Sequence, residues 1–219
     1  MMGKHSNNSF FMAMDLLGPS LGDLFLFCGN RFSLKTTLML GLQMLERLEV
    51  MHAISIIHRD IKPCNILMGI NDSSNILHLV DLGLGKRMVS SDTKEHIEYT
   101  TGNQMVGTAY YASINAHLGN EQSRRDDLEG LGYVLIQFLQ GTLPWHDIEY
   151  SSKKEKEEKI KDLKLSLSFT DLTKDCPEEI LKLMKYSREL GFKKAPDFTY
   201  LKTLMTSLAD KNRIDLHDK

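Results

Sequence analysis

The stretch that decides the fold is His-Arg-Asp-Ile-Lys-Pro-Cys-Asn at residues 58–65, together with Asp-Leu-Gly at residues 81–83. Each motif alone is ordinary, because an Asp in a loop is most often a capping or surface residue and Asp-x-Gly is most often a turn. Their combination is more specific. A helical pattern leads in, Asp60 and Asn65 share one loop, a short strand pair follows, and Asp81 comes directly after it. We therefore expect these polar side chains to belong to one site.

The sequence on either side of this loop predicts mostly helices and a few short strands. Ser33 is a suitable N-cap for a helix that runs to about Ala53, with leucines at helical spacing along one face. Residues 66–68 and 76–80 predict a two-stranded ribbon around a turn. Upstream, residues 10–17 (FFMAMDLL) predict a buried strand, and we find no partner strand for it in the residues before.

The second half of the chain predicts further helices. Residues 90–112 are polar and aperiodic, which is typical of a functional or disordered loop. Residues 128–139 are apolar almost all round and predict a buried central helix that Gly141 ends. The three remaining predicted helices cover residues 153–163, 177–190 and 196–209.

Composition excludes several classes of protein. The chain has 219 residues, of which 42% are hydrophobic and 26% are charged, as in a globular domain with a sizeable core. Its apolar runs are shorter than a membrane span, and the net charge of −2 argues against nucleic acid as the main partner. The three cysteines form no Cys-x-x-Cys pair, so we expect no disulfide framework or zinc site and a reducing compartment, cytoplasm or nucleus.

The order of the two motifs matches the order in which a protein kinase places its catalytic loop and its metal-binding Asp. Phosphoryl transfer depends on positioning and on neutralising charge, and Mg²⁺ prefers hard oxygen ligands. Asp60 would orient the substrate hydroxyl and accept its proton, and Lys62 would contact the transferred phosphate. Asn65 and Asp81 would supply oxygens to the metal ion.

Four other residues would support this site. His58 and Arg59 belong to the catalytic loop, and Gly83 would leave the backbone free for a conformation that a side chain forbids. Asp127 admits two interpretations: it caps the buried helix, or it holds the catalytic-loop backbone from beneath.

Further segments make a more specific resemblance. They are Met-Asp-Leu-Leu-Gly-Pro-Ser-Leu at residues 14–21, Gly-Thr-Ala-x-Tyr-Ala-Ser-Ile-Asn-x-His-Leu-Gly at 107–119, Glu-Gln-Ser-Arg-Arg-Asp-Asp-Leu-Glu at 121–129, Leu-Pro-Trp at 143–145 and Lys-x-Pro-Asp-x-x-Tyr-Leu at 194–201. In these segments, from about residue 10 to residue 208, the chain resembles the casein kinase 1 family of Ser/Thr protein kinases.

The resemblance implies one protein-kinase-like (α+β) domain over residues 1–219, with a hinge at about 12–18 and a mostly α-helical C-terminal lobe at about 19–210. It implies ATP and Mg²⁺ as cofactors, acidic protein substrates and a monomer. It also implies an adenine site, with Met14 at its back, the backbone of Asp15 and Leu17 bonded to adenine, Leu67 as its floor and Asp23 near the ribose.

The sequence departs from this family in two places. Family members carry a strand-rich N-terminal lobe with a Gly-rich loop, a strand Lys and a partner Glu, and we do not find these motifs here. We therefore expect the chain alone to have little or no activity, which leaves a catalytically silent binding module as the alternative. Tyr110 stands where the family has an Arg that helps to hold a substrate phosphate. Lys156 resembles another member of that anion site, which we expect to be weak.

Two other patterns have ordinary explanations. Gly-Pro-Ser-Leu-Gly at residues 18–22 matches the nucleophile elbow of hydrolases, but that elbow needs a parallel sheet already built upstream. The Lys- and Glu-rich residues 153–159 mix both charges at helical spacing, which is typical of a solvated helix face rather than a localisation signal.

Overall fold

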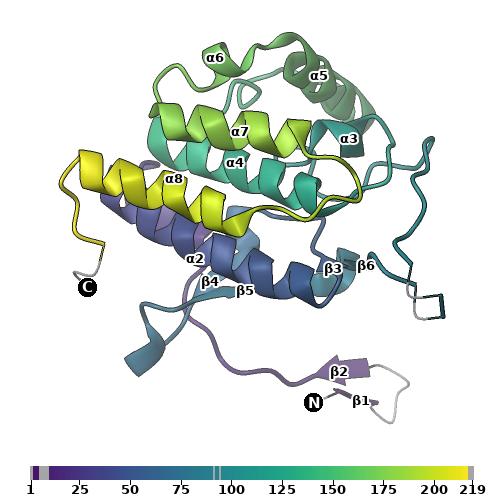
Figure 1. Cartoon of the computed structure of the whole chain (residues 1–219), viewed down its shortest axis with the longest axis horizontal. Coiled ribbons are helices and arrows are strands. Elements are labelled where there is room, and N and C mark those ends of the chain that lie inside the picture. The colour runs from purple at the N-terminus through teal and green to yellow at the C-terminus, as the bar shows by residue number, and fades with distance from the viewer. Residues whose placement is uncertain (1, 5–9, 91, 94, 217–219) are drawn as a thin grey trace.

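Long helices form the body of the molecule, with α4 (Arg124–Gln140) packed between others (Figure 1). The computed structural model describes residues 2–4, 10–90, 92–93 and 95–216. α4 lies against α2 (Leu34–Ala53) and α7 (Glu178–Glu189), while α8 (Phe198–Lys211) covers α2 and α7. α5 (Lys153–Ser166) is a further long helix. The remaining helices are short: α1 (Leu21–Phe27), α3 (Ile114–His117), α6 (Phe169–Leu172) and the 3₁₀ helices η1 (Pro63–Asn65), η2 (Asn71–Ser73) and η3 (Leu82–Leu84).

Capping residues fix the ends of the two central helices. The Ser33 side chain accepts a hydrogen bond from Thr36 N and caps α2, as predicted. α4 begins at Arg124, before the predicted start, and its N-cap is Ser123 rather than Asp127. Gly141 ends α4 with φ at +90°, a conformation that favours glycine.

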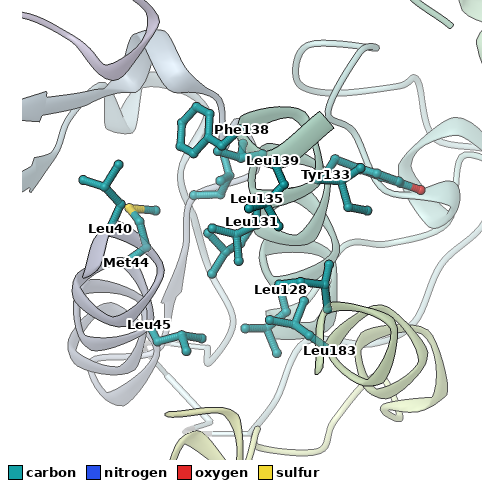
Figure 2. Close-up of a cluster of buried hydrophobic side chains, with 14 of the residues drawn as sticks. Leu40, Met44, Leu45, Leu128, Leu131, Tyr133, Leu135, Phe138, Leu139 and Leu183 are labelled. Atoms are coloured by element: carbon teal, nitrogen blue, oxygen red, sulfur yellow. The ribbon is translucent and has the colours of Figure 1, made fainter. Parts of the chain in front are cut away.

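The hydrophobic core lies where α2, α4 and α7 meet (Figure 2). From α2 come Leu40, Met44 and Leu45, and from α7 comes Leu183. α4 is buried on nearly all sides, as its sequence predicts, so Leu128, Leu131 and Leu135 face this core while Tyr133 points away from α2. Packing in this core fixes α4, whose first turn lies next to residues 58 and 59.

The strands pair in small antiparallel sheets. β4 (Ile66–Met68) pairs with β5 (Leu77–Leu79) and confirms the predicted ribbon. β3 (Ile56–Ile57) pairs with β6 (Lys86–Arg87). Residues 58–65 follow β3 and residues 81–83 follow β5, and a hydrogen bond from Val80 N to Asn65 O joins the two segments.

The prediction for residues 10–17 is wrong in three respects. Strand β2 spans only Phe10–Met12, its side chains are exposed, and it does have an upstream partner, β1 (Met2–Lys4), with Gly3 opposite Phe11. An apolar run predicts a strand from its pattern, but the pattern does not tell whether anything packs on its faces. Figure 1 shows this hairpin apart from the helical body.

The remaining predictions agree with the structure to within a few residues. Residues 90–112 contain no helix or strand in their described part, and α5, α7 and α8 lie where helices were expected. No helix in the described ranges is both long and apolar enough to cross a membrane.

Candidate active site

Asp60 lies at the centre of a hydrogen-bond network in the loop between β3 and η1. Its Oδ2 accepts from Lys62 Nζ at 2.7 Å and from Asn65 Nδ2 at 3.1 Å, and its Oδ1 accepts from the backbone N of Thr108 at 2.8 Å. Lys62 Nζ also donates to Thr108 Oγ1 at 3.1 Å. The structure thus brings Asp60, Lys62 and Asn65 together, as the sequence predicts, and adds Thr108.

The network keeps Asp60 ionised. Burial acts to raise the pKa of this carboxyl, but the hydrogen bonds from Lys62 and Thr108 and the positive charge of Lys62 outweigh burial and lower the pKa below its usual value. An ionised carboxylate held in one orientation is suited to orient a hydroxyl and accept its proton.

Asp127, in the first turns of α4, holds the catalytic loop from beneath. Its Oδ2 accepts from His58 N and its Oδ1 from Arg59 N, both at 2.9 Å. His52 Nε2, from the last turn of α2, donates to Oδ2 at 2.9 Å. Of the two interpretations of Asp127, the supporting role is therefore the one that its contacts fit.

His58 connects the loop to β5. Its Nε2 donates to the carbonyl of Val80 at 2.9 Å, and its Nδ1 accepts from Asp60 N at 3.3 Å. Arg59 has a left-handed backbone, with φ at +68°, and its Nε donates to the carbonyl of Leu84 at 2.6 Å. Both residues therefore tie residues 58–65 to residues 80–84.

Asp81 lies next to the catalytic loop because Val80 N donates to the carbonyl of Asn65 at 2.9 Å. The left-handed residue of this motif is Asp81, with φ at +65°, and not Gly83, so the predicted reason for the glycine is wrong. Gly83 instead donates its N–H to Asp81 Oδ1 at 3.2 Å, and a Cβ there would approach that oxygen to 3.0 Å.

Asn65 and Asp81 have the donor chemistry that Mg²⁺ requires. The Asn65 amide nitrogen is occupied by Asp60, which leaves its side-chain oxygen as the acceptor, and Asp81 is an exposed carboxylate. The described residues contain no cluster of three or more His, Cys, Asp or Glu that could hold a metal alone. Two protein oxygens supplemented by phosphate are the usual Mg²⁺ environment in nucleotide enzymes.

The sequence matches the protein kinase domain family over residues 4–209. The chain belongs to the protein kinase family. Protein kinases are phosphotransferases that use ATP with Mg²⁺ and act on protein substrates, and the arrangement of Asp60, Lys62, Asn65 and Asp81 is consistent with that chemistry.

The segment expected to bind adenine runs beside β4 of this kinase domain. Gly18 N donates to Met68 O at 2.8 Å, and Met68 N donates to Pro19 O at 3.0 Å. A hollow of about 360 Å³ separates residues 14–17 from β5, and its lining includes Met14, Asp15 and Leu17.

Two of the expected nucleotide residues lie outside that lining. Leu67 lies on β4 opposite His78 and next to Ser20. Asp23 lies in the first turn of α1, where its Oδ2 accepts from Ser20 N at 3.1 Å and Ser20 Oγ at 2.6 Å. These bonds lower the pKa of Asp23. They also show that Ser20 caps a helix, which is its ordinary role.

Lys156 lies at the edge of another hollow, of about 340 Å³, next to the catalytic loop. The lining consists of residues 107–110 together with Lys153, Lys156 and Glu157 from α5. Lys156 Nζ lies 4.7 Å from the centre of the Tyr150 ring. Tyr110 turns its hydroxyl to His146 Nδ1, 3.1 Å away.

Sequence reasoning missed two residues of this site, Thr108 and His52. Thr108 lies in the family-like segment at residues 107–119, far from Asp60 along the chain. His52 lies on the buried face of α2, and nothing in the sequence indicates that it has a polar partner there. Only the fold brings Thr108 to Asp60 and His52 to Asp127.

Proposed function

We propose that this chain is a Ser/Thr protein kinase of the casein kinase 1 type, which transfers the γ-phosphate of ATP to serine and threonine hydroxyls of proteins. The observation that carries the proposal is the hydrogen-bonded set of Asp60, Lys62, Asn65 and Thr108, supported from beneath by Asp127. This set brings an ionised carboxylate, a cation and an amide oxygen together within one loop.

Each side chain has one role in the proposed reaction. Asp60 orients the attacking hydroxyl and takes its proton, and the bond to Thr108 fixes the direction of the carboxylate. Lys62 places a positive charge beside the transferred phosphate. Asn65 and Asp81 would hold Mg²⁺, which neutralises phosphate charge when bound.

Nucleotide binding is assigned to the hollow beside β5 and its surroundings. Met14 would lie at the back of the adenine site, the backbone of Asp15 and Leu17 would bond adenine, and Leu67 would form the floor. The backbone bonds between residues 18–19 and Met68 support this, because they fix the hinge segment next to β4. Asp23 would lie near the ribose.

Acidic proteins are the proposed substrates. Lys153 and Lys156 line the hollow beside Thr108, which supports a partner of negative charge. Tyr110 replaces the Arg expected in this family, and its hydroxyl is engaged with His146. We therefore propose that a phosphate already on the substrate is bound weakly here, with Lys156 as its main contact.

Phosphate transfer tests the proposal directly. The chain is incubated with labelled Mg-ATP and casein, and the labelled residues are separated as phosphoserine, phosphothreonine and phosphotyrosine. The proposal requires label, however weak, on serine and threonine, and loss of that label in Asp60→Asn, which keeps the size of the side chain but cannot accept the proton. Asp210→Asn changes an exposed Asp on α8, away from the site, and serves as the control.

The other outcomes are informative. Label that persists in Asp60→Asn would contradict the assigned base, and label on tyrosine would contradict the Ser/Thr type. A parent chain that melts cooperatively but transfers no phosphate would favour the binding-module alternative.

A further inference from the structure

Lys164 is a buried lysine that takes no part in the proposed chemistry. It lies on α5 with only 2% of its surface exposed. Its Nζ donates to the carbonyl of Ala109 at 2.9 Å and to the carbonyl of Ala112 at 2.6 Å. A single ammonium group therefore holds two carbonyls of one short loop segment, residues 108–112, which we call the shelf.

Trp145 holds the shelf at a third carbonyl. Its Nε1 donates to Tyr110 O at 2.9 Å. Lys164 Nζ also lies 4.8 Å from the centre of the indole ring and 4.4 Å from the centre of the Tyr133 ring. His117 Nε2 adds a hydrogen bond to Ala109 O at 3.0 Å. The carbonyls of residues 109, 110 and 112 are thus all bonded to groups of the helical body.

A buried ammonium group is unfavourable unless its protons are bonded. Burial lowers the pKa of Lys164, and Arg188 lowers it further, whereas Glu129 raises it. Two carbonyls and two aromatic faces compensate the charge. A methionine of similar length would fill the same space without that cost. The lysine at this position is therefore better explained by its hydrogen bonds to the two shelf carbonyls than by a contribution to the free energy of unfolding.

The other end of the shelf is in contact with the catalytic loop. Thr108 donates its N–H to Asp60 Oδ1 and accepts from Lys62 at its hydroxyl. Residues 108–110 also form one wall of the hollow that contains Lys153 and Lys156. A shift of the shelf would therefore move both the partner of the base and the wall of that hollow.

We propose that Lys164 and Trp145 are positioning residues that hold the shelf so that Thr108 stays seated against Asp60 and Lys62 and the adjacent hollow keeps its shape for the acceptor peptide. That these two residues hold the shelf does not depend on the proposed function, whereas their effect on catalysis rests on it. Misplacement of catalytic groups by about 1 Å can lower rates 100-fold.

Amide hydrogen exchange of the full chain tests the holding of the shelf without any activity. Three amides of the shelf are hydrogen-bonded: Thr108 N to Asp60 Oδ1, and Tyr111 N and Ala112 N to Thr108 O. In Lys164→Met we expect exchange at these three amides to accelerate at least tenfold. The amides of Met68 and Val80, bonded elsewhere, serve as internal references and should not change. Lys161→Met is the matched control, because it removes a lysine of the same helix that bonds neither carbonyl.

Kinetics test the consequence for catalysis. In Lys164→Met we expect kcat to fall at least tenfold and the KM for the acceptor peptide to rise several-fold, with the KM for ATP within twofold of the parent. A purely structural role would instead lower the melting temperature and change all parameters together. Lys164→Arg keeps the charge and the donors, and should recover part of the lost kcat.

Trp145→Phe covers the case in which Lys164→Met does not fold, because it keeps an aromatic ring and removes the donor to Tyr110 O together with the five-membered ring that carries it. It should produce the same changes to a smaller degree. Unchanged exchange of the shelf amides in a folded Lys164→Met, or in Trp145→Phe if the former does not fold, would overturn the proposal. If the parent chain transfers no phosphate, the proposed function fails, and the exchange result still decides whether these residues hold the shelf.

Discussion

Gly107 directly precedes the shelf and lies against the catalytic loop. Its φ is +103°, in the region that favours glycine, and a Cβ there would overlap the carbonyl oxygen of Arg59. The added methyl group would collide with a backbone atom, which cannot move aside by a change of side-chain rotamer. Gly102 in the same loop also has a positive φ, of +78°, but a Cβ there meets no heavy atom within 4 Å.

We expect Gly107→Ala to be more damaging than Gly102→Ala, although both place alanine in a left-handed conformation. The excess loss in the free energy of unfolding should be about 1–3 kcal/mol, the usual effect of forcing a methyl group into filled space. Urea unfolding of the two variants measures this difference. Because the displaced atom belongs to Arg59, next to Asp60, phosphate transfer should fall only in Gly107→Ala. Equal losses in the two variants would show that backbone strain alone decides the outcome.

The residues of the site differ in how far the sequence could predict them. Asp60, Lys62 and Asn65 lie within one loop, so local spacing was enough to group them. Asp81 follows a short ribbon whose pairing was predictable, so its closeness to Asn65 followed as well. Thr108 and His52 reach the site only through the path of a long aperiodic loop and the packing of α2 on α4. No local pattern encodes either one.

Helices α4 and α7 are joined by a buried ion pair as well as by apolar side chains. Arg188 Nε donates to Glu129 Oε1 at 3.1 Å, and Arg188 Nη2 donates to the hydroxyl of Tyr133 at 3.0 Å. The Glu129 side chain is 1% exposed. A carboxylate so deeply buried depends on its partner, since removal of one member of a buried pair leaves the other charge uncompensated.

Arg188→Met should therefore lower the free energy of unfolding by roughly 3 kcal/mol. Lys182→Met is the matched control, because Lys182 lies on the same helix and pairs with Glu178 at 3.1 Å on the exposed surface. We expect little change in that variant, since exposed pairs contribute little. Thermal and urea unfolding of both variants give the comparison, and similar losses in the two would contradict a special role for the buried pair.

The elements were predictable in proportion to their length. α2, α7 and α8 have several turns of periodic apolar residues. A side chain caps the start of α2 and of α8, and Pro177 precedes the start of α7, so pattern and chemistry agree. β3 and β6 span two residues each, which is too short for any periodicity. For β2 the pattern indicated a strand correctly, but exposure depends on what packs against the strand, which the pattern does not contain.

Asp126 links the start of α3 to the start of α4 and so to the core of the whole molecule. Its Oδ1 accepts from Ser113 Oγ at 2.6 Å and from Asn115 Nδ2 at 3.1 Å, and its Oδ2 accepts from Ser123 N at 2.6 Å. Arg125 lies 3.8 Å away. Burial nevertheless dominates these favourable contacts and raises the pKa of Asp126 from 3.8 to about 6.

A raised carboxyl pKa gives the stability of the molecule a definite dependence on pH. Between about pH 4 and pH 6 the folded chain binds more protons at Asp126 than the unfolded chain does, so the contribution of this group to stability falls as the pH rises. Above pH 6 the carboxyl is charged in both the folded and the unfolded chain, and the full free-energy cost of burying the charged carboxylate lowers stability. The usual gain in stability from other carboxylates runs in the opposite direction and hides this effect in the parent chain alone.

Comparison with Asp126→Asn isolates the effect, because the amide does not titrate while every other group does so in both proteins. We expect the stability of the parent relative to the variant to fall by roughly 2 kcal/mol between pH 4.5 and pH 7, given 1.36 kcal/mol per pKa unit. The variant loses the acceptor for Ser123 N and should be the less stable of the two at the acidic end. A relative stability that stays constant or rises across this range would mean that the hydrogen bonds from Ser113, Asn115 and Ser123 outweigh burial, and that Asp126 is charged at every pH at which the kinase domain is folded.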